Sequence, residues 1–351
     1  MRSSMGVLCA LLLVACDGGG DSDAGFGSDG GARDAGGPGD GGGASSCPPA
    51  ADSVGYEGSF PAAPEILEHV ELTVGGLTRE MALYVPPGRA SAPALILAFH
   101  GTGGGVDDGV WDTEANNLAD ENDQVLVVSP HARTMADGDW DQHGPGDIYF
   151  DTTEQDADVN ADLLLVRAII EEAVATWGVD RCRVYTAGFS NGAFFAQFVA
   201  MRMPDRIAGF VSGSGGFVEC SNTSDCHFAG TGTTCEDFAG QAGWCDCSGY
   251  EHPAVIPTTG HQPAGWIAHA ADDDIVSPYY SCRLAAQLDA AGFTYELHLR
   301  ESGGLTPPPD MMRLAWPVPR RPTACPDRSA ASAGVKLSGS RPFSWTCARR
   351  P

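Results

Sequence analysis

The sequence contains a single lysine, Lys336, and few basic residues of any kind. Twenty basic residues face 46 acidic ones, so the formal net charge is −26. Such a negative field repels phosphate backbones and anionic headgroups, which argues against nucleic-acid binding and against adsorption to a lipid surface. A long apolar run is also missing at the N-terminus, where residues 7–14 are too few to span a bilayer. We therefore expect contact with a membrane only through a covalent anchor.

The composition nevertheless predicts a folded protein. Hydrophobic residues make up 43% of the chain and aromatic residues 8%, which is enough to build a core and excludes a wholly disordered or collagen-like protein. A length of 351 residues fits one or two domains.

The N-terminus has the pattern of a bacterial lipoprotein signal. Arg2 supplies a positive charge, residues 7–14 are apolar, and residues 13–16 read Leu-Val-Ala-Cys, as in a lipobox. This pattern predicts a signal peptide over residues 1–16, lipidation of Cys16, and a protein anchored to the bacterial cell envelope or released outside the cell. An ordinary signal peptide cleaved nearby is the alternative.

A linker is predicted next, over residues 17–50. Residues 17–46 contain 13 Gly and six Asp with almost no large apolar side chain, so they cannot bury enough surface to offset the entropy of ordering. We expect a disordered, solvated tether.

The cysteines indicate disulfides. Without Cys9 and Cys16, ten of the 12 cysteines remain, an even number in an exported protein, where thiols tend to pair. Five of them fall between Cys220 and Cys247, in a Gly-, Ser- and Thr-rich insertion expected over residues 217–262 that resembles a lid.

The partners within this insertion stay open. Its Cys-x-Cys spacing resembles part of an epidermal-growth-factor-like module with one cysteine short, which Cys182 or Cys282 could supply. A zinc cluster with His227 or His252 is the alternative, and an oxidising compartment disfavours it. We expect no metal and no cofactor.

From residue 62 onward, short apolar runs alternate with longer amphipathic ones. This rhythm predicts an α/β fold, a mostly parallel central sheet with helices on both faces. The expected strands are 68–74, 79–85, 94–99, 124–129, 181–187, 207–212, 265–270 and 294–299, and the expected helices are 110–121, 156–178, 281–291 and one beginning near 193.

Residues 188–192, Gly-Phe-Ser-Asn-Gly, join an apolar strand to a helix. That context is typical of a nucleophile elbow, in which flanking glycines allow a crowded, strained turn and the serine hydroxyl is lifted clear of the sheet. Ser190 is therefore the predicted nucleophile, and a plain glycine-rich turn is the alternative.

A second glycine-rich turn, residues 100–104, ends an earlier apolar strand. Such a turn can direct a backbone N–H at a developing oxyanion. The predicted pair of donors is the N–H of Thr102 and the N–H of Asn191, which follows the nucleophile. A phosphate-binding loop is less consistent with the sequence, because no lysine follows the glycines and the chain is acidic.

Three aspartates, residues 272–274, follow a late strand, where the carboxylate of a Ser, acid, His order belongs. Asp273 is the predicted acid, and a solvated turn is the alternative.

The motifs together resemble those of a known family. They are His100-Gly101 after a strand; Asp180, Arg183-Val184-Tyr185 and Ser190-Asn191-Gly192 around the elbow; and a His-Gly-x-x-Asp-x-x-Val pattern near Asp273 in which Ala270 replaces the glycine. Over about residues 62–316 the sequence is similar to the secreted α/β-hydrolase esterases that include polyhydroxybutyrate depolymerases and feruloyl or acetylxylan esterases. The resemblance implies the α/β-hydrolase fold and places Asp273 as the acid.

The same resemblance leads us to expect Gly-Gly-His after the last strand, but the chain has Gly303, Gly304 and Leu305. The catalytic base is therefore unknown. His298 lies in the preceding strand, seven residues from position 305, or roughly 20 Å of extended chain. His269 is expected to be a structural residue that packs beneath the loop carrying Asp273, which we call the acid loop.

The hydrolase domain is predicted over residues 51–316, and the composition changes after it. Residues 317–351 hold seven basic residues and one acidic residue. This segment is a genuine basic tail, part of a decayed esterase, or the product of a reading-frame error.

Two functions follow from these patterns. The first is a serine carboxylic-ester hydrolase that acts through an acyl-enzyme on a small-molecule or polymeric extracellular ester. The alternative is a catalytically impaired surface lipoprotein that binds a glycan or protein partner.

Overall fold

The computed structural model describes residues 53–136, 145–216, 234–239, 256–258, 260–307 and 311–315. The predicted signal peptide with Cys16, the linker at 17–50, most of the insertion at 217–262 and the tail at 317–351 lie outside these residues. Within them, no helix is both long and apolar enough to cross a bilayer.

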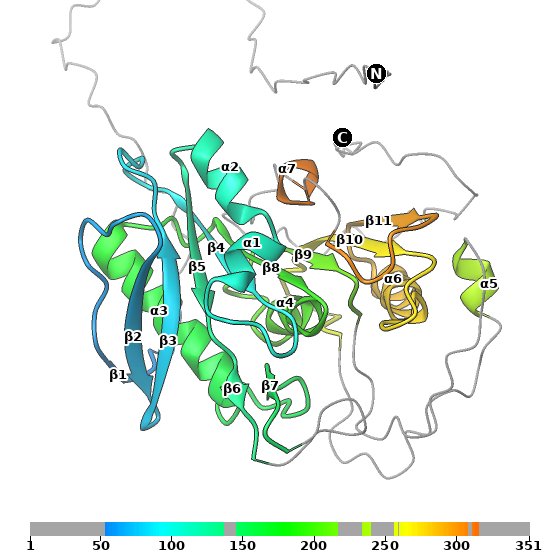
Figure 1. Cartoon of the computed structure of the whole chain (residues 1–351), viewed down its shortest axis with the longest axis horizontal. Helices are drawn as coiled ribbons and strands as arrows, with labels where there is room; N and C mark the ends of the chain where they lie inside the picture. The colour runs from blue at the N-terminus through cyan, green and yellow to red at the C-terminus, as the bar shows by residue number, and fades with distance from the viewer. Residues whose placement is uncertain are drawn as a thin grey trace, which may run out of the picture. The chain divides into compact units, whose positions relative to one another are not determined.

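A nine-stranded sheet forms the centre of the described chain (Figure 1). Its strands are β1 (Tyr56–Glu57), β2 (Glu68–Val74), β3 (Leu77–Tyr84), β4 (Ala94–Phe99), β5 (Val125–Pro130), β8 (Val184–Phe189), β9 (Gly209–Gly213), β10 (Ala264–Ala270) and β11 (Tyr295–Arg300). Their order across the sheet is β1-β2-β3-β5-β4-β8-β9-β10-β11. The pairs from β1 through to β5 are antiparallel, and those from β5 to β11 are parallel.

Burial explains the strand sequences. Every residue of β4, β5, β8, β9 and β10 is buried, as parallel strands covered on both faces require. The leading antiparallel pair is also confirmed: β2 and β3 turn at Gly75 and Gly76, whose φ angles of 59° and 81° favour glycine. A separate two-stranded sheet pairs β6 (Arg133–Thr134) with β7 (Ile148–Tyr149).

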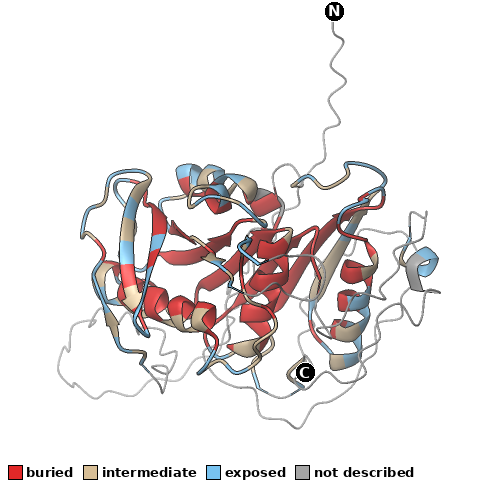
Figure 2. Cartoon of the chain, turned by 60° about the horizontal axis from the view of Figure 1, so that its bottom comes forward, coloured by how far each residue is buried: buried red, intermediate tan, exposed pale blue. Residues whose placement is uncertain are grey.

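Helices cover both faces of the sheet, as predicted. They are α1 (Asp108–Asp112), α2 (Ala115–Glu121), α3 (Ala161–Trp177), α4 (Asn191–Arg202), α5 (Cys235–Ala239), α6 (Tyr279–Ala291) and α7 (Met311–Ala315). Buried side chains of α3, α4 and α6 share one core cluster with the sheet, and those of α1, α2 and α7 share the cluster on the other face. Figure 2 shows α4 buried along almost its whole length, so this helix lies at the centre of the layer that it forms with α3 and α6.

Two predicted helices differ from those observed. The helix expected from residue 156 begins at Ala161, because the Asn160 side chain accepts hydrogen bonds from the N–H groups of Asp162 and Leu163 and caps it there. Val159, which lies inside the predicted helix range, precedes the cap and is 60% exposed. The helix expected at 110–121 is broken into α1 and α2 by Glu114, whose left-handed backbone interrupts the turn.

A disulfide joins the insertion to the main domain. Cys235 of α5 is bonded to Cys282 of α6, which confirms that a cysteine outside the cluster completes a pair within it. Cys182 is disulfide-bonded as well. The start of α6 follows the acid loop directly, so this disulfide ties the insertion to an element that borders the candidate site.

Candidate active site

The candidate site lies at the carboxyl ends of the parallel strands, where α/β sheets bind their ligands. Ser190 follows β8 and precedes α4, with φ 54° and ψ −125°. This backbone conformation is costly for any residue with a Cβ, and the surrounding structure holds it: the Ser190 N–H donates to the Gly213 carbonyl at 3.0 Å. The predicted elbow is therefore a strained strand-to-helix turn.

The glycines that flank this turn have no room for a side chain. A Cβ on Gly188 would collide with the Gly192 carbonyl, and a Cβ on Gly192 would collide with the carbonyl of Phe99 at the end of β4. The turn thus closes on itself and packs directly against the neighbouring strand.

The loop after β4 borders the serine. A Cβ built on Gly101 would lie 3.2 Å from Ser190 Cβ and 3.7 Å from its Oγ, so Gly101 faces the predicted nucleophile. Thr102, one of the two predicted oxyanion donors, follows at once and is exposed. Asn191, the other, is the first residue of α4, where an N–H has no acceptor within the helix. The structure therefore brings the predicted donors to the same strand edge as Ser190.

A third segment, which no sequence motif indicates, connects the loop after β4 to the start of α4. The Phe150 N–H donates to Asn191 Oδ1 at 2.8 Å, and Asn191 Nδ2 donates to the Phe150 carbonyl at 3.3 Å. The Gly103 N–H donates to the carbonyl of Ile148 in β7 at 2.8 Å. Segment 148–150 thus holds both halves of the candidate oxyanion site. No local pattern shows this, because Phe150 and Asn191 are 41 residues apart.

His100 supports the loop from below. It is fully buried, its Nδ1 lies 2.6 Å from the Gly101 carbonyl, and its Nε2 accepts the Ala132 N–H at 3.0 Å. One nitrogen donates and the other accepts, so the imidazole is neutral. Burial is the main reason that the pKa of His100 falls to about 4.

Asp273 lies in the loop after β10, as predicted, and it is the only buried member of the three aspartates at 272–274. Its Oδ1 accepts the N–H groups of Ile275 at 3.1 Å and Val276 at 2.9 Å. Its Oδ2 lies 3.3 Å from Nε2 of the buried His269 and accepts no hydrogen bond from the described residues. Burial raises the pKa of the Asp273 carboxyl, but His269 and the two N–H groups outweigh it, so the net pKa lies below its ordinary value.

Leu305 is positioned by the turn after β11. The Gly304 N–H donates to Asp272 Oδ1 at 2.7 Å, which fastens this turn to the acid loop. Leu305 then packs against the buried cluster of Phe194, Val276 and Tyr280. Its side chain therefore lies between the acid loop and α4, the helix that begins after Ser190.

His298 and His269 make contacts with other residues. His298 hydrogen-bonds to Glu296 at 3.0 Å, and its ring lies 5.0 Å from that of Trp266, which belongs to the cluster on the α1, α2 and α7 face. His269 packs beneath the acid loop, as expected.

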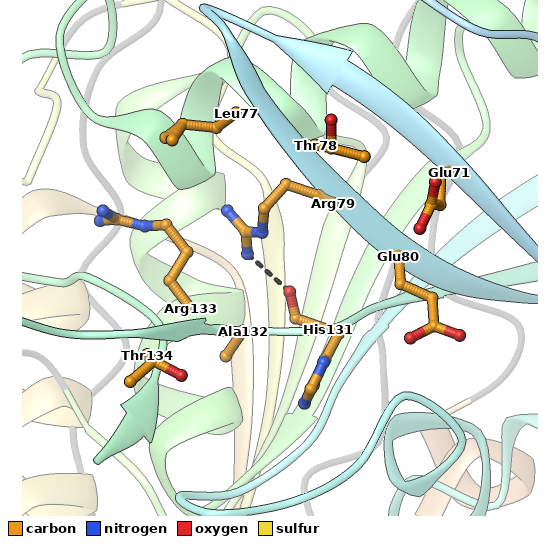
Figure 3. A pocket seen from close by; sticks show the side chains of 9 residues that line it. All are labelled: Glu71, Leu77, Thr78, Arg79, Glu80, His131, Ala132, Arg133 and Thr134. Atoms are coloured by element: carbon orange, nitrogen blue, oxygen red, sulfur yellow. Dashed lines mark hydrogen bonds between the residues drawn. The ribbon is translucent and has the colours of Figure 1, made fainter. Parts of the chain in front are cut away.

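A cavity of about 390 Å³ lies between β3 and the segment at β6 (Figure 3). In it the Arg79 guanidinium donates to the His131 carbonyl at 2.6 Å and to Asp162 at 2.6 Å. It is lined by Glu71, Leu77, Thr78, Arg79, Glu80, His131, Ala132, Arg133 and Thr134, none of them a predicted site residue. Among the residues that the structure describes, no cluster of three or more His, Cys, Asp or Glu side chains could hold a metal ion.

The strand order, the strained serine and the buried acid define an α/β-hydrolase. A family model described as "Esterase PHB depolymerase" matches residues 79–302, and the chain belongs to this family.

Individual relatives are similar over part of their length. Feruloyl esterase B of Talaromyces stipitatus is 25% identical over 213 residues, 56% of this chain and 53% of its own. Poly(3-hydroxyalkanoate) depolymerase C of Paucimonas lemoignei is 26% identical over 242 residues, 62% of this chain and 52% of its own. The chain thus spans about half the length of these curated relatives. The solved acetyl xylan esterase of Aspergillus awamori superposes with a TM-score of 0.47 at 18% identity, covering 68% of this chain and 93% of that one.

Proposed function

We propose that the protein is a serine carboxylic-ester hydrolase that acts on an extracellular ester. The observation that carries this proposal is the strained Ser190, which faces Gly101 on one side and shares its strand edge with the buried Asp273. A strained backbone at a serine between two crowded glycines has no structural use that a relaxed turn would not serve better.

In the proposed reaction, Ser190 Oγ attacks the ester carbonyl and loses its proton to a base, and the carbonyl oxygen becomes an oxyanion. The N–H groups of Thr102 and Asn191 donate to that oxyanion. The tetrahedral intermediate expels the alcohol, which takes up a proton, and leaves an acyl group on Ser190. Water then releases the acid by the same steps.

The proposed step that runs poorly in this chain is the removal of the Ser190 proton. Asp273 can orient and stabilise an imidazolium, but position 305, where the family pattern has the histidine that would act as the base, is occupied by leucine. A hydroxyl without a base is a poor nucleophile. We therefore expect slow hydrolysis, since an enzyme that lacks a triad member typically keeps about 10³–10⁴-fold catalysis over water.

The substrate class is proposed from the relatives. Their names describe a feruloyl esterase and a poly(3-hydroxyalkanoate) depolymerase. We propose a small-molecule or polymeric ester of this range, reached from a cell surface. In this arrangement, residues 1–16 are a signal peptide, Cys16 carries the lipid, residues 17–50 are the tether, and residues 51–316 form the hydrolase domain.

The test uses a short-chain p-nitrophenyl ester and two substitutions. The unmodified protein should hydrolyse it slowly, and Leu305→His should raise kcat/KM by at least about 100-fold, the range that general base catalysis typically contributes. Ser190→Ala added to Leu305→His should abolish the gain. Leu305→Gln, polar and of similar size but unable to act as a base near pH 7, is the matched control and should give no gain.

A second function is favoured by Leu305 itself. Leu305 packs on Phe194, Val276 and Tyr280, so its apolar side chain stabilises the fold but cannot act as a base. This is what we expect of a hydrolase scaffold that binds a glycan or protein partner without cleaving it. A folded Leu305→His protein without any gain in hydrolysis would support this function and contradict the esterase proposal.

A further inference from the structure

Two buried histidines flank the candidate site, and their hydrogen bonds lead to opposite protonation states. The partners of His100 are one carbonyl and one N–H, which match a neutral imidazole. The partners of His269 are different, and each of its nitrogens can be assigned in turn.

The first nitrogen is assigned through Ser281. The Ser281 hydroxyl donates to the Gly215 carbonyl at 2.6 Å, and a hydroxyl has only one proton. Toward His269 Nδ1, which lies 2.7 Å away, the same oxygen can therefore only accept. Nδ1 must carry a proton.

The second nitrogen faces oxygens that have no proton to give. His269 Nε2 lies 2.7 Å from the Val276 carbonyl and 3.3 Å from Asp273 Oδ2. A carbonyl is always an acceptor, so a bare Nε2 would place its lone pair against an oxygen at hydrogen-bond distance. Nε2 must carry a proton too.

We propose that His269 is an imidazolium that neutralises Asp273 and acts as its positioning residue. The catalytic consequence rests on the proposed function, whereas the charge of His269 does not. His269 is fully buried and its ion partner Asp273 is almost as buried, so neither charge could be maintained alone.

The surroundings of His269 contain no competing charge among the described contacts. From α6, His269 contacts the neutral Ser281, which also bonds to the Gly215 carbonyl in the loop after β9. In the neighbouring strand β11, the residue paired with His269 is the apolar Leu299. The acid loop supplies Asp273, the one ionised group that faces the ring. The lowered pKa of the Asp273 carboxyl agrees with a cation at this distance.

This pairing explains how an acid can stay in place without a base beside it. The Val276 carbonyl accepts the hydrogen bond from the Nε2–H of His269, so Asp273 Oδ2 is balanced in charge but accepts no hydrogen bond from the described residues. An oxygen in that state can accept an N–H from an imidazole introduced at position 305. The acid site is therefore preformed whether or not a base is present.

Nitrogen-15 NMR of the histidine-labelled full-length protein at pH 7.5 tests the charge. His269, assigned by the loss of its signals in His269→Gln, should have a proton on both ring nitrogens, and His100 should have one. In Asp273→Asn, His269 should lose one proton because its counterion is gone. A single protonated nitrogen on His269 in the unmodified protein overturns the proposal.

The positioning role has its own readout, the carbon-13 titration of the Asp273 carboxyl. Ser281→Ala removes the acceptor for Nδ1, so Asp273 should titrate at higher pH than in the unmodified protein. Ser277→Ala is the matched control and should leave the titration unchanged, because Ser277 is a buried serine just before α6 whose side-chain oxygen accepts the Tyr279 N–H. An unchanged Asp273 titration in folded Ser281→Ala refutes the positioning role. An inactive Leu305→His protein would end the esterase proposal and leave the result for His269 standing.

Discussion

The side chain of Asn191 pairs with both backbone groups of Phe150, accepting from its N–H at 2.8 Å and donating to its carbonyl at 3.3 Å. This places the residue after the predicted nucleophile in two roles: its own N–H is a candidate oxyanion donor, and its side chain fixes the segment that also holds the Gly103 N–H. The two candidate donors are thereby held relative to each other.

Asn191→Ala should therefore weaken both the fold and the reaction. It leaves the buried N–H and carbonyl of Phe150 without partners, which should lower the free energy of unfolding by about 1–3 kcal/mol. Activity should be measured in the Leu305→His background, where we expect kcat to fall with little change in KM. Asn191→Asp keeps the acceptor and loses the donor, so it should be intermediate; equal stability of the Ala variant and the parent would contradict this role.

The destabilisation caused by a Gly→Ala substitution in the site should be larger where there is less space for a Cβ. Gly192→Ala puts a Cβ against the Phe99 carbonyl, which cannot move without shifting β4, and should lower the free energy of unfolding by about 3 kcal/mol or more. Gly101→Ala puts a Cβ 3.2 Å from Ser190 Cβ and 3.6 Å from the Phe189 carbonyl, a milder approach, and should leave a folded protein whose kcat in the Leu305→His background is reduced. Chemical denaturation and ester hydrolysis check this order, and the reverse order would show that the elbow is packed differently.

His100 should make stability depend on pH. Its pKa is about 4 in the folded protein, against an ordinary value of 6.5, so between these values the unfolded chain binds a proton that the folded chain does not. The free energy of unfolding should fall as the pH falls through this window, by up to about 3 kcal/mol.

Urea denaturation at a series of pH values, compared between the unmodified protein and His100→Asn, isolates this contribution. Asp112 acts in the opposite direction, because burial and then the Asp108 carboxylate raise its pKa to about 6, and its contribution cancels in the comparison. The same pH dependence in both proteins would show that His100 is not the group responsible.

The disulfide between Cys235 and Cys282 should restrain the insertion and leave the sheet unaffected. Peptide mapping without reductant should recover the two residues in one linked fragment. Cys235→Ser should make residues 217–262 more sensitive to protease while the far-ultraviolet circular dichroism stays the same. Free thiols at both positions in exported protein would overturn the pairing.

The predicted lipid anchor at Cys16 is tested by metabolic labelling with a fatty acid. The label should be incorporated into the protein and should be lost in Cys16→Ser, because only the cysteine of the lipobox offers a thiol at the cleavage point. A Cys16→Ser protein that stays labelled and bound to the membrane would refute the anchor.

Much of the fold could be predicted from local patterns. The expected ends of β4, β5, β8 and β10 lie within three residues of the observed ends, because buried parallel strands have nearly continuous apolar sequences. Helix ends were harder to predict, because they depend on caps. The Asn160 side chain starts α3 and the backbone of Glu114 splits α1 from α2, and neither effect alters the apolar periodicity.

The sequence by itself determined the sheet, the two covering layers and the chemical types of Ser190 and Asp273, because burial and turn geometry limit which residues can occupy such positions. Only the tertiary structure decided which groups meet. It brought Phe150 to Asn191, Leu305 to Phe194 and His269 to Asp273, and chain segments separated by many residues come together through packing that no local pattern records. The protonation of a buried imidazole depends on the oxygens around it, and those are set by three different loops and helices.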